Sequence, residues 1–118
     1  MAVKVLVVED EYLVRQLAVE ALTVAGFHVL EAADGPEALA YCAEGDPDVL
    51  FTDIQLPGEV DGWDVARKCR ESHPTLPVLY ATAARLDIMK AVPGSTLFQK
   101  PYTPDQLVGV VQALTRRN

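Results

Sequence analysis

Five residues carry side chains that could together perform phosphoryl chemistry, and each follows a short apolar segment. They are Glu9 and Asp10 after 3–8, Asp53 after 49–52, Thr82 after 78–81, and Lys100 after 96–99. Three carboxylates, a hydroxyl and an amine make a costly packed core, because buried like charges repel. The same groups suit Mg²⁺, which binds one or two carboxylates together with phosphate oxygens.

Phosphoryl transfer needs an aligned nucleophile and positive charge around the transferring oxygens. We expect Asp10 and Asp53 to supply carboxylates to Mg²⁺, and Asp53 to act as the nucleophile, so that the product is an acyl phosphate. The ammonium of Lys100 would neutralise charge, and the Thr82 hydroxyl would hydrogen-bond a phosphoryl oxygen. These roles require the ends of separate strands to meet.

The elements that must position these residues alternate between strand and helix patterns. The sequence pattern predicts five strands, namely Val3–Val8, Phe27–Ala32, Val49–Thr52, Val78–Ala81 and Thr96–Gln99, and the first is a β-branched segment suited to burial on both faces. Apolar residues at spacings of three and four predict helices between them, and Thr103-Pro104-Asp105-Gln106 fits a capping box that starts the last helix. Strands that alternate with helices predict a parallel, doubly wound α/β sheet with its ligand site at the carboxyl ends of the strands.

Length and charge restrict the function further. The 118 residues predict a single domain over residues 1–118, and the net charge of −7 does not favour direct nucleic-acid binding. No segment approaches the roughly 20 apolar residues that span a bilayer, and no signal peptide precedes the first strand, so we expect a cytoplasmic protein without membrane contact.

Cys42 and Cys69 lack CxxC spacing, which predicts reduced, largely buried thiols. His28 and His73 have no ligand-spaced neighbours and are predicted to be surface residues.

The motifs at the strand ends resemble those of response-regulator receiver domains of bacterial two-component systems. Val-Val-Glu-Asp-Glu, Thr-Asp-Ile-Gln-Leu-Pro-Gly, Ala-Thr-Ala and Lys-Pro-Tyr occur in the family's order, and the resemblance covers essentially the whole chain. It implies a flavodoxin-like sheet of order 2-1-3-4-5. It also implies a phosphorylation-dependent switch in phosphorelay signal transduction, in which Asp53 accepts a phosphoryl group from a sensor histidine kinase or a histidine phosphotransfer protein.

The resemblance adds residue roles that the strand pattern does not supply. It implies that the backbone carbonyl of Gln55 is a further Mg²⁺ ligand, that Glu9 acts on the metal through water, and that the Lys100–Pro101 bond is cis. Thr82 and Lys100 would grip the phosphoryl group, which the domain would slowly hydrolyse without turnover on an external substrate. Gln55 and Ala84 flank the pocket in this family and are where tuning of phosphate loss is expected. A downstream protein partner would bind the face made by the fourth helix, fifth strand and fifth helix.

The chain departs from the family pattern at three places. The loop after Asp53 is one residue longer, at Gly58-Glu59-Val60, and the segment between Thr82 and Lys100 is shorter and contains Pro93-Gly94, which predicts a short fourth helix. Leu97 replaces the usual aromatic residue three positions before the lysine, and Phe98 beside it is expected on the opposite face of the strand. Tyr80-Ala81-Thr82 and the short helix resemble a Phe-Ala-Thr-Gly type subgroup that often works with HWE-class kinases.

Two other functions share part of this pattern. A phosphatase that resembles the haloacid-dehalogenase enzymes would also use an aspartyl nucleophile and Mg²⁺. Such enzymes carry a second Asp as general acid two residues after the nucleophile, where this chain has Gln55. A structural interaction domain that is never phosphorylated could keep the same fold. Treatment with acetyl phosphate and Mg²⁺ separates the second alternative from a switch.

Overall fold

One parallel sheet of five strands organises the chain in a computed structural model, which describes residues 2–83 and 90–116. The strands are Lys4–Val8 (β1), His28–Ala32 (β2), Val49–Asp53 (β3), Val78–Thr82 (β4) and Thr96–Gln99 (β5). Their order in the sheet is β2-β1-β3-β4-β5, as predicted. The chain moves from β1 outward to β2 and then crosses back to β3, so the strand order reverses between β1 and β3.

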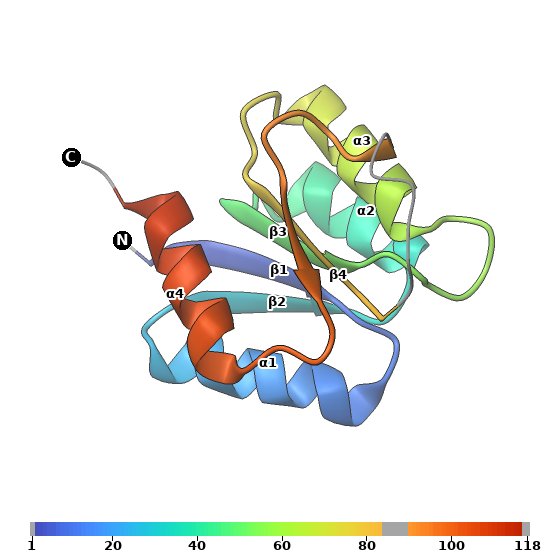
Figure 1. Cartoon of the computed structure of the whole chain (residues 1–118). Helices are drawn as coiled ribbons and strands as arrows, with labels where there is room; N and C mark the ends of the chain where they lie inside the picture. Colours follow the sequence, from blue (N-terminus) through green and yellow to red (C-terminus); the bar gives the residue numbers. More distant parts are fainter. Residues whose placement is uncertain (1, 84–89, 117–118) are drawn as a thin grey trace.

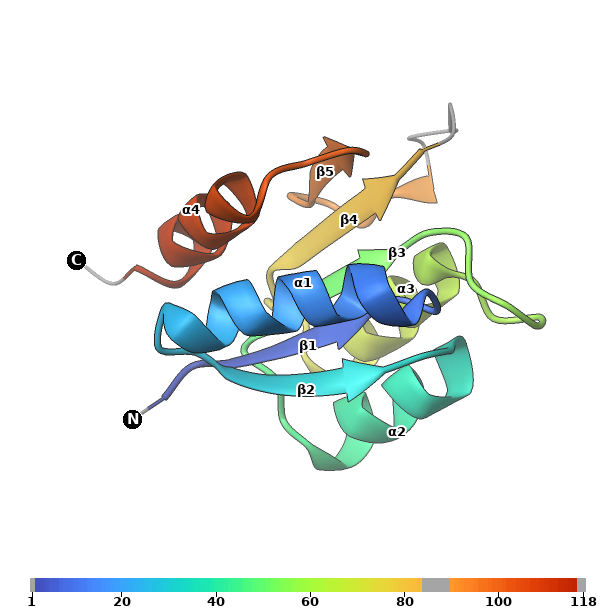
Figure 2. The ribbon, with the colours of Figure 1, turned by 90° about the horizontal axis from the view of Figure 1, so that it is seen from below.

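Two pairs of helices cover the two faces of the sheet. The helices are Tyr12–Val24 (α1), Gly35–Glu44 (α2), Gly62–Ser72 (α3) and Pro104–Thr115 (α4). Helices α1 and α4 lie on one face and α2 and α3 on the other (Figures 1 and 2). Within the described residues, no helix has both the length and the apolar character needed to cross a membrane.

Alternate residues of the central strands fill two separate cores, because successive side chains of a strand point to opposite faces. Leu6, Val8 and Leu50 pack toward α2 and α3. Val5, Val7 and Val49 pack toward α1 and α4. Both faces of β1, β3 and β4 are therefore buried, which is why these strands appear as continuous apolar segments in the sequence.

Local sequence signals fix where the helices begin. The Asp34 carboxylate accepts a hydrogen bond from the Glu37 amide at 2.9 Å and caps α2. A capping box of Asp61 and Asp64 starts α3. The predicted box of Thr103 and Gln106 starts α4.

The connection between β4 and β5 is described from residue 90 onward. Residues 84–89 of the expected short fourth helix, Ala84 among them, lie outside the described residues, and residues 90–95 form no α-helix. The helix expected as the fifth is α4. The Val92 amide donates a hydrogen bond of 3.1 Å to the Tyr80 hydroxyl, which joins this connection to the core. The ring of Tyr80 packs edge-on against Trp63, with ring centroids 4.7 Å apart. Burial raises the pKa of the Tyr80 hydroxyl.

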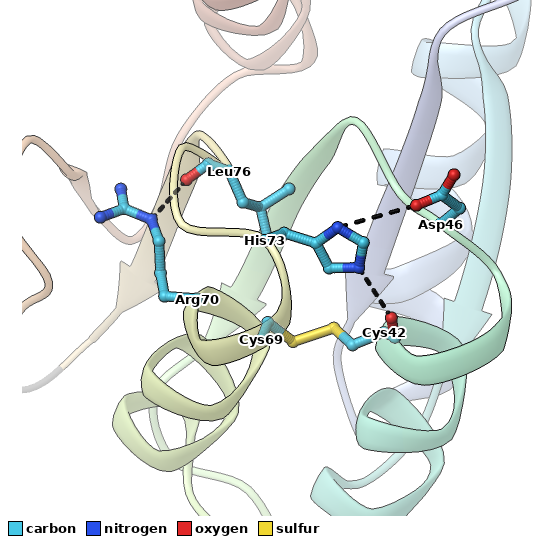
Figure 3. The surroundings of a disulfide bond; sticks show 6 residues. All are labelled: Cys42, Asp46, Cys69, Arg70, His73 and Leu76. Carbon is cyan, nitrogen blue, oxygen red and sulfur yellow. Dashed lines mark hydrogen bonds and ion pairs between the residues drawn. A yellow bond between two sulfur atoms is a disulfide. The ribbon is translucent and has the colours of Figure 1, made fainter.

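The prediction of reduced thiols is wrong, because Cys42 and Cys69 form a disulfide bond (Figure 3). The cysteines stand 27 positions apart, a spacing that matches no redox or metal motif and therefore does not indicate a bond between them. Helices α2 and α3 lie side by side, which brings the two Cα atoms to 5.5 Å, within the range of disulfides. Both residues are buried, as expected.

The ends of α2 and α3 are joined by a second contact beside the disulfide. The ring of His73 lies between the carbonyl oxygen of Cys42, 3.0 Å from Nε2, and the carboxylate of Asp46, 3.7 Å from Nδ1 (Figure 3). His73 is thus half-buried rather than a free surface residue, whereas His28 is exposed as predicted. Neither histidine belongs to the metal-binding group found among the described residues.

Candidate functional site

Backbone hydrogen bonds continue the sheet past the strand ends and hold the predicted site residues there. The Glu9 amide donates to the carbonyl of Ala32 at 3.0 Å, next to the end of β2. The amide of Lys100 donates to the carbonyl of Thr82 at 2.8 Å. The residues that follow β1 and β5 are therefore fixed to neighbouring strands, as a parallel sheet requires.

Three carboxylates meet at the carboxyl ends of the strands. One oxygen each from Glu9, Asp10 and Asp53 lies within 4.8 Å of the others, and no second group of this kind occurs among the described residues. Glu9 and Asp53 are largely buried, whereas Asp10 is exposed. Hard carboxylate oxygens at an edge open to water fit Mg²⁺, which binds through few carboxylates and keeps several waters. The donor set therefore could hold this ion.

Lys100 lies between two of the carboxylates. Its ammonium nitrogen is 2.6 Å from Glu9 Oε1 and 3.2 Å from Asp53 Oδ2. Burial raises the pKa of Glu9, although the hydrogen bond from Lys100 partly opposes this effect. Burial on its own would lower the pKa of Lys100, but the hydrogen bond to Glu9 and the charges of Asp53 and Glu9 outweigh it, so the pKa is raised. The ammonium therefore remains charged at neutral pH.

The remaining predicted residues are arranged around Asp53. Thr82 ends β4 and is buried, and β4 is the strand next to β3. The Gln55 amide donates a hydrogen bond of 3.3 Å to Asp53 Oδ1, a contact that the sequence did not predict. The Lys100–Pro101 bond is cis, as the resemblance implied. The role of the Gln55 carbonyl as a metal ligand stays a prediction.

Helix α3 begins directly on the backbone of Asp53. The Gly62 amide donates a hydrogen bond of 2.8 Å to the carbonyl of Ile54, and a methyl group at Gly62 would meet Asp53 O and would lie 2.7 Å from Ile54 Cα. Only glycine allows this approach. In the sequence the position is marked only by the pair Asp61-Gly62, which on its own is typical of a turn.

Leu97 and Phe98 lie on opposite faces of β5, as predicted. Phe98 packs toward α1 and α4 and stacks on Tyr102 with ring centroids 5.5 Å apart, whereas Leu97 is exposed. Phe51 meets the same Tyr102 ring edge-on. Burial raises the pKa of Tyr102 to about 12. The aromatic side chain of this strand is therefore part of the α1/α4 core.

The strand order and the acidic site define a flavodoxin-like α/β domain with a lysine beside a carboxylate cluster. The family model of the response regulator receiver domain matches residues 5–112, so the chain belongs to the receiver-domain family of two-component systems. Members of this family are signalling proteins.

Similar proteins include whole regulators and separate receivers. The transcriptional regulatory protein TrcR of Mycobacterium tuberculosis is 39% identical over 121 residues, which cover 98% of this chain and 46% of TrcR. The chain thus spans about half the length of the curated relatives it matches. A crystal structure of a response regulator receiver protein from Sinorhizobium medicae WSM419 superposes with a TM-score of 0.91 at 35% identity, covering 96% of this chain and 94% of that one. The receiver domain of the hybrid histidine kinase CckA is also 35% identical, with a TM-score of 0.83 and coverage of 96% and 99%.

Proposed function

We propose that residues 1–118 act as one phosphorylation-dependent receiver, in which Asp53 accepts a phosphoryl group from a phosphohistidine. The observation that carries this proposal is the meeting of Glu9, Asp10 and Asp53 with Lys100 at the switch point of the sheet. A nucleophile, a metal-binding carboxylate pair and a fixed cation are the parts that phosphoryl transfer requires.

In the proposed reaction, a carboxylate oxygen of Asp53 attacks phosphorus as the bond from phosphorus to the donor imidazole nitrogen breaks. The electron pair of that bond leaves with the imidazole, and an acyl phosphate forms on Asp53. Bound by Asp10, Asp53 and the Gln55 carbonyl, with Glu9 acting through water, Mg²⁺ would neutralise charge on the phosphoryl oxygens. Lys100 would contribute a second positive charge, and the Thr82 hydroxyl would hydrogen-bond one of these oxygens.

The surface beside the site supports a protein as phosphodonor. Tyr12, Leu13 and Leu17 on α1 are each more than half exposed although they are large and apolar. A cavity of about 370 Å³ opens next to them and reaches the site lysine; it is lined by Val14, Leu17, Ala18, Ala83, Lys100, Pro101, Tyr102 and Pro104. Exposed apolar surface of this kind marks contacts between proteins. We infer that the sensor histidine kinase, or a histidine phosphotransfer protein, docks here.

The output is proposed to pass to a downstream protein through β5 and the helices beside it. Leu97 on this edge strand is exposed and could contact such a partner. We further propose a cytoplasmic location, where a kinase would supply the phosphoryl group, although a structural disulfide such as Cys42–Cys69 is rare in that reducing compartment. We propose no direct contact with nucleic acid, since the net charge is −7.

Intact-mass measurement after treatment with acetyl phosphate and Mg²⁺ tests the function. The wild-type protein should gain one phosphoryl group, and Asp53→Asn should gain none while keeping its circular dichroism spectrum. Asp46→Asn is the matched control, because Asp46 precedes the amino end of β3, away from the carboxyl ends of the strands that carry the site, and should leave the modification unchanged. Unmodified wild-type protein would indicate a structural interaction domain instead. Many cycles of hydrolysis on small phosphomonoesters would indicate a phosphatase.

A further inference from the structure

Arg15 holds the backbone of the turn that carries two of the three site carboxylates. Its Nη1 donates a hydrogen bond of 2.8 Å to the carbonyl oxygen of Glu9. Its Nε forms an ion pair of 3.1 Å with Glu31, and its guanidinium lies 5.5 Å from the centre of the Tyr12 ring. The side chain is 14% exposed. These contacts fix a planar group whose fork can bind two acceptors at once.

The turn from Glu9 to Glu11 has few other anchors on the side of α1. Glu11 is the N-cap residue of this helix, but its side chain makes no capping hydrogen bond. The Glu11 amide instead donates to the Glu9 carboxylate at 3.2 Å, and that carboxylate already accepts from Lys100. The hydrogen bond from Arg15 is thus a direct side-chain contact from the body of α1 to the turn.

We propose that Arg15 is a positioning residue for the metal, which keeps Glu9 and Asp10 in the orientation that binds Mg²⁺. This inference rests on the proposed function of the acidic site. Arg15 acts through the backbone carbonyl of Glu9 and does not itself contact the ion. Residues that orient metal ligands from outside the coordination shell typically change metal affinity about 10-fold to 100-fold when they are replaced.

The positive charge of Arg15 predicts the opposite change in Mg²⁺ affinity when Arg15 is replaced. The two roles can therefore be distinguished by experiment. A guanidinium bound to the backbone of Glu9, in the turn that carries two site carboxylates, repels a divalent cation, so loss of that charge alone should strengthen Mg²⁺ binding. Loss of positioning should weaken it. The direction of the change in Kd therefore distinguishes a positioning role from a purely electrostatic one.

Calorimetric titration with MgCl₂ should compare the wild type with Arg15→Met, Arg15→Lys and Gln16→Met. Gln16 is the matched control because its side chain binds the same Glu31 oxygen, at 2.6 Å, from the adjacent position and has no described contact with Glu9. We expect Arg15→Met to raise the Kd for Mg²⁺ about tenfold. Arg15→Lys keeps the charge but loses the fork, so its Kd should also rise, while Gln16→Met should match the wild type. Amide hydrogen exchange of the metal-free protein should accelerate at Glu11 in both Arg15 variants.

A Kd that falls or stays constant in Arg15→Met would overturn the inference, as would an equal rise in Gln16→Met. Should Arg15→Met not fold, the comparison of Arg15→Lys with Gln16→Met decides by the same criterion. A wild-type protein that binds no Mg²⁺ would instead contradict the proposed function, so the two failures are distinguishable.

Discussion

Reduction of the Cys42–Cys69 disulfide should cost the domain a large part of its stability. The bond closes a loop with a sequence separation of 27. In the chain-entropy model, a loop of this length removes about 12 cal/mol/K from the unfolded chain, or about 3.5 kcal/mol at 25 °C. With an unfolding entropy near 2.1 cal/mol/K per residue, about 250 cal/mol/K for the chain, this corresponds to a fall in Tm of about 14 °C.

The measurement compares oxidised and reduced wild-type protein. Both forms have the same sequence, so no side chain is removed and no cavity is created in the core. Reduction should be carried out in denaturant and followed by refolding under reductant, because both cysteines are buried in the native protein. Thermal unfolding by circular dichroism gives the two Tm values, and thiol counting by alkylation and mass spectrometry verifies each redox state.

The double variant Cys42→Ala/Cys69→Ala provides the control. Its Tm should not respond to reductant, because it has no bond to break. Two alkylatable thiols in protein prepared without reductant would refute the disulfide itself. Equal Tm values for the verified oxidised and reduced forms would refute the loop-entropy reasoning.

Three other properties of the domain can be checked by unfolding and titration. Gly62→Ala should prevent α3 from starting on the backbone of Asp53 and lower the Tm by about 4–12 °C, as overpacked sites cost about 1–3 kcal/mol. Mg²⁺ at about one hundred times its Kd should stabilise the protein by about 2.7 kcal/mol, and Asp10→Asn should reduce this effect; an unchanged Tm at saturating Mg²⁺ would contradict the metal site. Because the pKa of Tyr102 is raised to about 12, the unfolded chain loses this proton first, so stability should fall between about pH 10 and pH 12 by roughly 2–3 kcal/mol, and Tyr102→Phe should flatten that decline in alkaline denaturation.

The convergence of the acidic residues could be predicted from the sequence because parallel strands leave their carboxyl ends at one edge. Each predicted segment identifies a strand, buried at β1, β3 and β4 and partly exposed at the edge strand β5, and the residue after it then has a fixed place. This reasoning located Glu9, Asp53 and Lys100 without any contact information. The boundaries were less certain: Asp53 and Thr82 are the last residues of β3 and β4 rather than the residues that follow them.

Contacts between elements had no comparable signal. The disulfide depends on which helices share a face of the sheet and on how they are rotated, and neither quantity is encoded in the spacing of Cys42 and Cys69. Arg15 was missed for a similar reason. Its position in the second turn of α1 is ordinary for a surface arginine, and its role depends on a backbone carbonyl, which any residue at position 9 would provide.

The cross-link between α2 and α3 also determines how this pair of helices can move. Cys69 lies near the end of α3, whereas Gly62 at its beginning touches the backbone of Asp53. Because the disulfide ties the later part of α3 to α2, we expect α3 to rotate about that point rather than slide along its axis. Any shift that starts at Asp53 would then be largest in the first turn of α3, while α1 and α4, across the sheet, carry no such hinge.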